Sequence, residues 1–105
     1  MSRTIRPQEL KQLLESGDKP LILDVRRRDD FESDRSMLPD AQRRDPEEVA
    51  TWAPDLPHDR EIVIYCAHGR SVSNSILDHL LGQGLSARFV EGGLDAWKSS
   101  GGETS

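Results

Sequence analysis

Two short apolar runs constrain the fold of this chain most strongly. Residues 21–25 read LILDV and residues 61–65 read EIVIY, and charged residues lie next to both runs. The first run is short, mostly apolar and bounded by charge, which is typical of a strand buried on both faces of a parallel sheet. The second run indicates a strand by its β-branched and aromatic residues. We therefore expect strands at both places, and a third strand over residues 87–90, which read ARFV.

Helical patterns separate these strands. Leucines recur at helical spacing between Pro7 and Gly17, and residues 71–83 show apolar residues at the same spacing before a glycine-rich stop. The shorter elements that we expect are helices over residues 29–34, from Asp45 to just before Pro54 and over residues 94–99, and an extended piece near residues 41–43. Strands that alternate with helices in this way predict an α/β fold with a central, mainly parallel sheet.

The length and the clustering of apolar residues indicate one folded domain. The chain has 105 residues, which is too few for two domains of the usual size. Charged residues make up 31% of the chain and hydrophobic residues 34%, but the hydrophobic residues gather in runs, so a modest core is expected. We expect the domain to cover residues 1–98 and a flexible tail to cover residues 99–105.

Charge and hydropathy argue against two classes of partner. No stretch approaches the length of a membrane span, and the polar start of the chain lacks the apolar region of a signal peptide, so we expect a cytoplasmic protein with no membrane partner. The net charge of −5, without a long basic stretch, argues against nucleic acid. Arginines do cluster at residues 26–28 and at residues 43–44, and runs of this kind usually form a solvated face.

Cys66, the only cysteine of the chain, directly follows the apolar run at residues 61–65. Ligands of open parallel sheets bind beyond the carboxyl ends of the strands, so this is the position where chemistry is expected. The loop from Cys66 to Ser71 leads into a helix, and the backbone N–H groups of such a loop form an anion-binding cup when they turn inward. A thiolate or a persulfide would be stabilised in that cup, whereas the alternative interpretation of Cys66 is an ordinary buried thiol.

Two side chains of this loop have more than one interpretation. Arg70 either supplies a fixed positive charge for an anionic donor or points to solvent. His68 either transfers a proton or is the surface residue that a lone loop histidine more often is. The three histidines and Cys66 show no recognised metal-ligand spacing, so no metal site is expected.

Three segments of the chain, in order, resemble the rhodanese-like family. Residues 23–26, followed by Asp30 and Phe31, are similar to the early Asp-Val-Arg segment of that family. Residues 65–71 resemble its active-site loop, and residues 90–97 resemble its closing segment with Gly-Gly and Ala-Trp. The resemblance spans nearly the whole chain and implies a rhodanese-like three-layer α/β fold, with helices on both sides of the sheet.

The resemblance also implies an activity, which is sulfur transfer. Cys66 would accept a sulfane sulfur from a small anionic donor such as thiosulfate and pass it to an acceptor such as cyanide in vitro, a thiol or a protein, with no cofactor. Carried over position by position, the resemblance implies Cys66 as the nucleophile and the backbone N–H groups of five residues as the substrate-binding cup: Ala67, His68, Gly69, Arg70 and Ser71. Asp24, Arg26 and Trp97 fall on positions that are chiefly structural.

Two departures from the family pattern leave the specificity open. Many members carry an arginine five residues after the cysteine, but here that residue is Ser71 and the arginine is one position earlier. The usual Gly-His-Ile-Pro-Gly-Ala stretch corresponds to residues 35–41, which keep only Pro39 and Ala41.

Two other functions compete with this interpretation. A cysteine phosphatase or arsenate reductase of the related fold needs an arginine six residues after the cysteine, and Val72 cannot supply its bidentate contact to oxyanions. A non-catalytic sulfur carrier or regulatory module stays open, because a fold does not fix a function.

Overall fold

The centre of the protein is a parallel sheet. The computed structural model describes residues 3–17, 19–68 and 71–104, and in these residues five strands pair in the order β1-β5-β4-β2-β3, with every neighbouring pair parallel. The strands are β1 (Thr4–Ile5), β2 (Leu21–Asp24), β3 (Gln42–Arg43), β4 (Ile62–Tyr65) and β5 (Ala87–Val90). The strand expected over residues 61–65 is β4, the central strand, and all four of its residues are buried.

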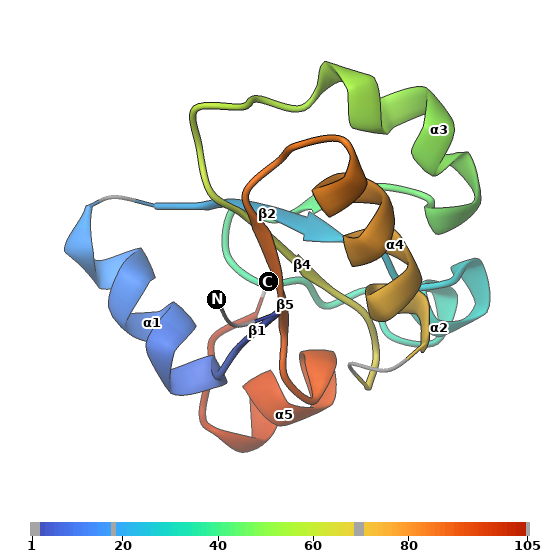
Figure 1. Ribbon diagram of the computed structural model, residues 1–105. Coiled ribbons are helices and arrows are strands. Elements are labelled where there is room, and N and C mark those ends of the chain that lie inside the picture. Colours follow the sequence, from blue (N-terminus) through green and yellow to red (C-terminus); the bar gives the residue numbers. More distant parts are fainter. Residues whose placement is uncertain (1–2, 18, 69–70, 105) are drawn as a thin grey trace.

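Helices cover both faces of this sheet and make three layers (Figure 1). On one face lie α1 (Pro7–Ser16) and α5 (Gly93–Ser99), whose apolar residues pack with Val63 and Tyr65 of β4. On the other face lie α3 (Val49–Trp52) and α4 (Ser71–Gly82), which pack with Ile62 and Ile64. The alternation of side chains along β4 therefore divides the core into two clusters and confirms the three-layer α/β fold.

The short helix α2 (Arg28–Ser33) has no buried residue. It follows the end of β2, and its first residues lie across a pocket from Val72 and Ser75 of α4. α2 therefore belongs to the carboxyl edge of the sheet, the edge at which Cys66 stands.

Local signals in the sequence set the end of α1 and the start of the following 3₁₀ turn. Gly17 closes α1 in the left-handed region, with a φ of 93°. The Asp45 carboxylate accepts a hydrogen bond from the Glu47 backbone N–H at 2.9 Å and starts the 3₁₀ turn η1 (Pro46–Glu48). The helix expected from Asp45 ends at Trp52, before Pro54 as predicted, but the chain continues into a second 3₁₀ turn, η2 (Ala53–Asp55), which contains that proline.

The two outer strands have only two residues each. The extended piece expected near residues 41–43 is β3, whereas β1 was not predicted. β1 pairs with β5 through Thr4 opposite Phe89 and Ile5 opposite Val90, and Ile5 is fully buried. Two residues are too few to show a periodic pattern, so only the pairing with β5 makes this segment a strand.

The chain beyond α5 folds back on Trp97. The indole Nε1–H of Trp97 donates a hydrogen bond to the Glu103 carbonyl at 2.8 Å, and the Gly102 N–H donates to the Trp97 carbonyl at 2.9 Å. These contacts involve residues beyond 98, the expected end of the domain. The flexibility of residues 99–105 stays a prediction. In the described ranges no helix has the length and apolar character needed to cross a membrane.

Candidate active site

Cys66 stands at the carboxyl end of the central strand, as the sequence predicts. It directly follows β4, and only 6% of its surface is exposed. Ala67 is half-buried, His68 is exposed, and α4 begins at Ser71. Gly69 and Arg70 lie outside the described residues.

The first turn of α5 contacts the backbone of this loop. The Leu94 N–H donates a hydrogen bond to the Cys66 carbonyl at 2.8 Å, and the Asp95 N–H donates to the Ala67 carbonyl at 3.1 Å. The Asp95 carboxylate also lies 3.5 Å from Nδ1 of His68, although both side chains are mostly exposed. Sequence reasoning assigned α5 to packing through Trp97 and missed its contact with the cysteine loop. The only signal in the sequence was the glycine pair that precedes the helix.

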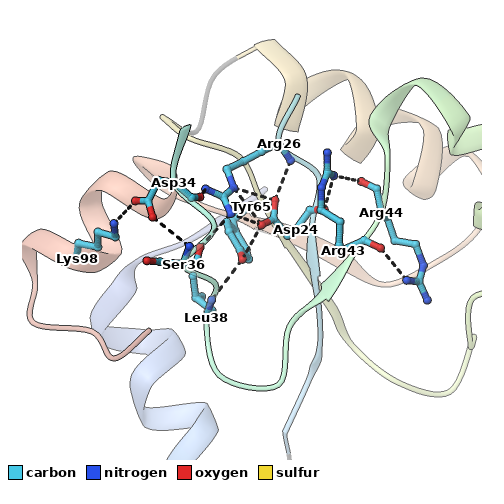
Figure 2. Close-up of polar contacts among 9 residues, drawn as sticks. All are labelled: Asp24, Arg26, Asp34, Ser36, Leu38, Arg43, Arg44, Tyr65 and Lys98. Carbon is cyan, nitrogen blue, oxygen red and sulfur yellow. Dashed lines mark hydrogen bonds and ion pairs between the residues drawn. The ribbon is translucent and has the colours of Figure 1, made fainter. Parts of the chain in front are cut away.

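The neighbouring strand β2 ends in a buried ion pair (Figure 2). Asp24 is 0% exposed and Arg26 is 1% exposed. The Arg26 Nε–H lies 3.0 and 3.1 Å from the two carboxylate oxygens of Asp24, and a terminal N–H of Arg26 donates to Oδ2 at 2.6 Å. Two further N–H groups of the guanidinium donate to the backbone carbonyls of Asp34 at 2.6 Å and Ser36 at 2.9 Å.

Tyr65 connects this ion pair to the central strand. Its hydroxyl donates a hydrogen bond to Oδ2 of Asp24 at 3.1 Å and accepts one from the Leu38 N–H at 3.3 Å. Asp24, Arg26 and Tyr65 therefore tie β2 and β4 to the segment from Asp34 to Leu38, which agrees with the structural role expected for Asp24 and Arg26. Their polar atoms are used by one another and by the backbone, which leaves this cluster unsuited to binding a substrate.

Burial and charge shift the pKa values of this region in predictable directions. Burial, with the Asp24 carboxylate nearby, raises the pKa of Tyr65. Burial by itself lowers the pKa of the Arg26 guanidinium, but its hydrogen bonds and attraction to Asp24 outweigh burial and raise that pKa. Outside the buried cluster, the ammonium group of Lys98 and the backbone N–H of Ser36 bind the Asp34 carboxylate and lower its pKa.

The arginine clusters are not a solvated face as a whole. That prediction is wrong for Arg26, because Asp24 supplies a counter-charge that allows it to be buried. The guanidinium groups of Arg26 and Arg43 lie 5.1 and 4.9 Å from the centre of the Phe31 ring, so a cation–π contact also holds Arg43. Arg27 and Arg28 are exposed, as predicted.

Pockets at this edge of the sheet are formed by residues within the described ranges. The larger, of about 520 Å³, lies between α2, η1 and α4, with Val72 and Ile76 on one side and Arg27 and Arg28 on another. The smaller, of about 160 Å³, lies beside Ala67 and His68 and is also lined by acidic and basic side chains. The lining residues that complete the larger pocket are Asp29, Asp45, Pro46, Glu47 and Ser75.

The side chain at the position of the phosphatase arginine packs in the core. Val72 is half-buried and packs against the cluster on the α4 face of the sheet. It therefore supplies apolar contact rather than a charge for an oxyanion. Among residues 3–17, 19–68 and 71–104, no three His, Cys, Asp or Glu side chains come together as a metal site would require.

Comparison with known proteins agrees with this geometry. Residues 6–100 match the family model of the rhodanese-like domain. The chain is 32% identical over 99 residues to a thiosulfate sulfurtransferase GlpE of Pseudomonas syringae pv. syringae, a match that covers 93% of this chain and 89% of the relative. It is 29% identical over 102 residues to a sulfurtransferase of Allochromatium vinosum, covering 96% and 92% of the two chains.

A solved structure shows the same architecture. The crystal structure of a rhodanese-related protein from Thermoplasma volcanium superposes with a TM-score of 0.84 at 25% sequence identity, over 98% of this chain and 97% of that one. The family match, the relatives and the shared fold all extend over nearly the full length of the sequence. The chain belongs to the rhodanese-like domain family.

Proposed function

We propose that this protein is a sulfurtransferase that carries a sulfane sulfur as a persulfide on Cys66. The observation that carries the proposal is the position of the chain's only cysteine at the end of the buried central strand, on the loop that leads into α4. The names of the relatives support sulfur transfer as the class of activity. Thiosulfate as the donor is part of our proposal.

The reaction that we propose has two displacement steps. In the first, the Cys66 thiolate attacks the outer sulfur of thiosulfate, the S–S bond of the donor breaks, and sulfite leaves with the bonding electron pair. In the second, cyanide or an acceptor thiolate attacks the outer sulfur of the persulfide, and the Cys66 thiolate leaves. The chain has no second cysteine to resolve the persulfide, so the sulfur leaves to an external acceptor.

Backbone N–H groups take the role of anion binding in this proposal. The negative charge on the persulfide would be held by the N–H groups of residues 67–71, and the dipole at the start of α4 adds to their effect. The half-buried Val72 favours sulfur transfer over phosphatase chemistry, which needs an arginine at that position. Because the persulfide forms only on a reduced thiol, we also propose that the protein works in a reducing compartment such as the cytoplasm.

The donor dianion is favoured by positive charge near the loop, and we consider two candidate sources of that charge. Arg70 lies on the loop itself, and the exposed Arg27 and Arg28 line the larger pocket at the same edge of the sheet. We propose that Arg70 binds the donor, so Arg70→Ala would raise the thiosulfate concentration required for half-maximal rate and leave residual activity. Arg27→Ala is the matched control. If only the Arg27 variant required more thiosulfate for half-maximal rate, the donor would be bound by the arginines of the larger pocket instead of Arg70.

Two measurements test the function. Incubation with thiosulfate is expected to add one sulfur atom to the intact protein, as measured by mass spectrometry, and Cys66→Ser is expected to abolish both this gain and thiocyanate formation from thiosulfate and cyanide. Serine is close in size but forms no persulfide, so thermal unfolding should change little. Thiocyanate formation by the serine variant at the wild-type rate would refute the mechanism. A sulfur adduct without thiocyanate turnover would instead indicate a sulfur carrier.

A further inference from the structure

We infer that the first turn of α5 is a positioning element for the active site, and that the backbone N–H of Asp95 sets the orientation of the His68 amide in the anion-binding cup. This inference rests on the proposed function, because it assigns a task in binding the persulfide. Its basis is the pair of hydrogen bonds from Leu94 and Asp95 to the carbonyls of Cys66 and Ala67, at 2.8 and 3.1 Å.

Because each peptide is planar, these two hydrogen bonds also fix the direction of two backbone N–H groups. The Cys66 carbonyl shares a peptide plane with the Ala67 N–H, and the Ala67 carbonyl shares one with the His68 N–H. In a trans peptide the C=O and N–H bonds point in opposite directions, and the described residues contain no cis peptide. Both N–H groups therefore point away from α5.

The direction away from α5 is the side of the sheet that α4 covers. Side chains alternate along β4, with Val63 and Tyr65 packed on the α1 and α5 side and Ile62 and Ile64 on the α4 side. Cys66 directly follows Tyr65, so an alternation that extends one residue beyond β4 would direct its side chain to the α4 side. In that arrangement the thiol and the two amide N–H groups share one side of the sheet, as a cup around the sulfur requires.

The Cys66 and Ala67 carbonyls both point toward α5, so the backbone at these residues does not continue the extended strand β4. In an extended strand successive carbonyls alternate, so their N–H groups cannot converge on one anion. Successive N–H groups that face the same concavity form the backbone nest that binds anions elsewhere. The contacts with α5 hold Ala67 and His68 in that arrangement.

The start of α5 is fixed by its surroundings. Gly92 and Gly93 both have positive φ, 76° and 64°, and a Cβ on Gly92 would lie 2.5 Å from the Cβ of Ala96. The Glu91 N–H donates to the Ile5 carbonyl at 2.9 Å, and Trp97 is 1% exposed. The N–H donors of α5 thus reach the loop from a rigid support, which is what positioning a site requires.

Asp95 allows a test that separates its backbone from its side chain. Asp95→Pro removes the N–H that bonds the Ala67 carbonyl, and proline is tolerated in the first turn of a helix, where no helical partner is lost. Asp95→Ala, the matched control, keeps the N–H and removes only the carboxylate, which is 76% exposed. We expect Asp95→Pro to lower the rate of thiocyanate formation about tenfold or more relative to Asp95→Ala, because an oriented donor to a reacting anion has a large effect on rate.

A spectroscopic readout separates positioning from loss of stability. In the wild type and in Asp95→Ala, loading Cys66 with sulfur should move the amide proton resonances of Ala67 and His68, because both N–H groups face the persulfide. In Asp95→Pro the response of His68 should be lost while that of Ala67, which depends on Leu94, persists. Equal rates and equal amide responses in the two variants would overturn the inference.

If Asp95→Pro does not fold, the amide measurement on the wild-type protein still tests the positioning role. Amide protons of Ala67 and His68 that do not respond to sulfur loading, in a protein whose mass shows the persulfide, would overturn the positioning role and leave the proposed function intact. Failure of the wild type to take up sulfur would instead refute the proposed function, since the amide measurement starts from the loaded protein.

Discussion

The ends of β2 and β4 lie side by side in the sheet, with Asp24 opposite Tyr65, yet they are built on opposite principles. The end of β2 holds a buried carboxylate and a buried guanidinium that bond each other and nearby carbonyls. The end of β4 leads into a loop that carries the Cys66 thiol, and α5 donates hydrogen bonds to the Cys66 and Ala67 carbonyls of this loop. Charged side chains thus hold the structure at one strand end, whereas at the other we propose that backbone N–H groups bind the persulfide.

The polar groups at the two strand ends differ in how they are satisfied. Every strong charge of the Asp24 and Arg26 pair has a fixed partner, so the pair contributes rigidity and specificity of packing. A persulfide is stabilised by groups that bind negative charge and that do not themselves act as nucleophiles. Backbone N–H groups meet both conditions. Variants at the two strand ends should therefore differ in their effects on stability and on turnover.

The largest effect on stability is expected for Arg26→Met. This variant leaves the Asp24 carboxylate buried without its partner, which should cost about 3–5 kcal/mol of the free energy of unfolding. Urea unfolding measures the loss, and the rate of thiocyanate formation per folded molecule should stay near that of the wild type. The stability of Arg26→Lys, which keeps the charge but not the planar guanidinium, should lie between those of the wild type and Arg26→Met. Wild-type stability combined with lost turnover would instead place Arg26 in the reactive site.

A smaller loss is expected for Tyr65→Phe. The variant removes the hydroxyl that bonds Asp24 and Leu38, and leaving these buried groups short of a partner should cost about 1–3 kcal/mol. The change lies one residue from Cys66, so unchanged turnover per folded molecule would confirm that the two strand ends act separately. Turnover that falls more than the folded fraction would show that they are coupled.

The same hydroxyl predicts a pH dependence on the alkaline side. Burial raises the pKa of Tyr65 above its ordinary value of about 10, so the folded state keeps the proton where the unfolded state has lost it. The stability that Tyr65 contributes is therefore complete below about pH 10 and is lost as the pH rises through the folded value. The wild type should lose stability above pH 10 more steeply than Tyr65→Phe. Parallel curves would contradict the pKa shift.

The smallest effect is expected for Lys98→Met, which removes an exposed ion pair. Lys98 and Asp34 are about 40% exposed, so solvent screens the pair. Lys98 lowers the pKa of Asp34, and its contribution is therefore present above the ordinary carboxyl value of about 4 and is lost as the pH falls through the folded value. Thermal unfolding should show a slight loss at neutral pH that disappears in acid and at high ionic strength. A loss as large as that of Tyr65→Phe would show that the pair is not an ordinary surface pair.

Elements whose signals are local could be predicted from the sequence. The apolar runs predicted β2 and β4, Gly17 predicted the end of α1, and Asp45 predicted the start of the turn at η1. It also placed Cys66 at a strand end, because the strand and the cysteine are adjacent in the chain. These features depend on side-chain periodicity and capping within a few residues, which a single sequence displays directly.

Features that join distant residues depend on the tertiary structure and could not be predicted. β1 exists because it pairs with β5, more than eighty residues away, and Arg26 is buried because the fold surrounds it with Asp24 and with carbonyls of the following loop. The approach of α5 to the Cys66 and Ala67 carbonyls joins residues more than twenty-five positions apart. No local pattern encodes such contacts, since hydrogen bonds and charge pairs between distant segments form only when packing brings the segments together.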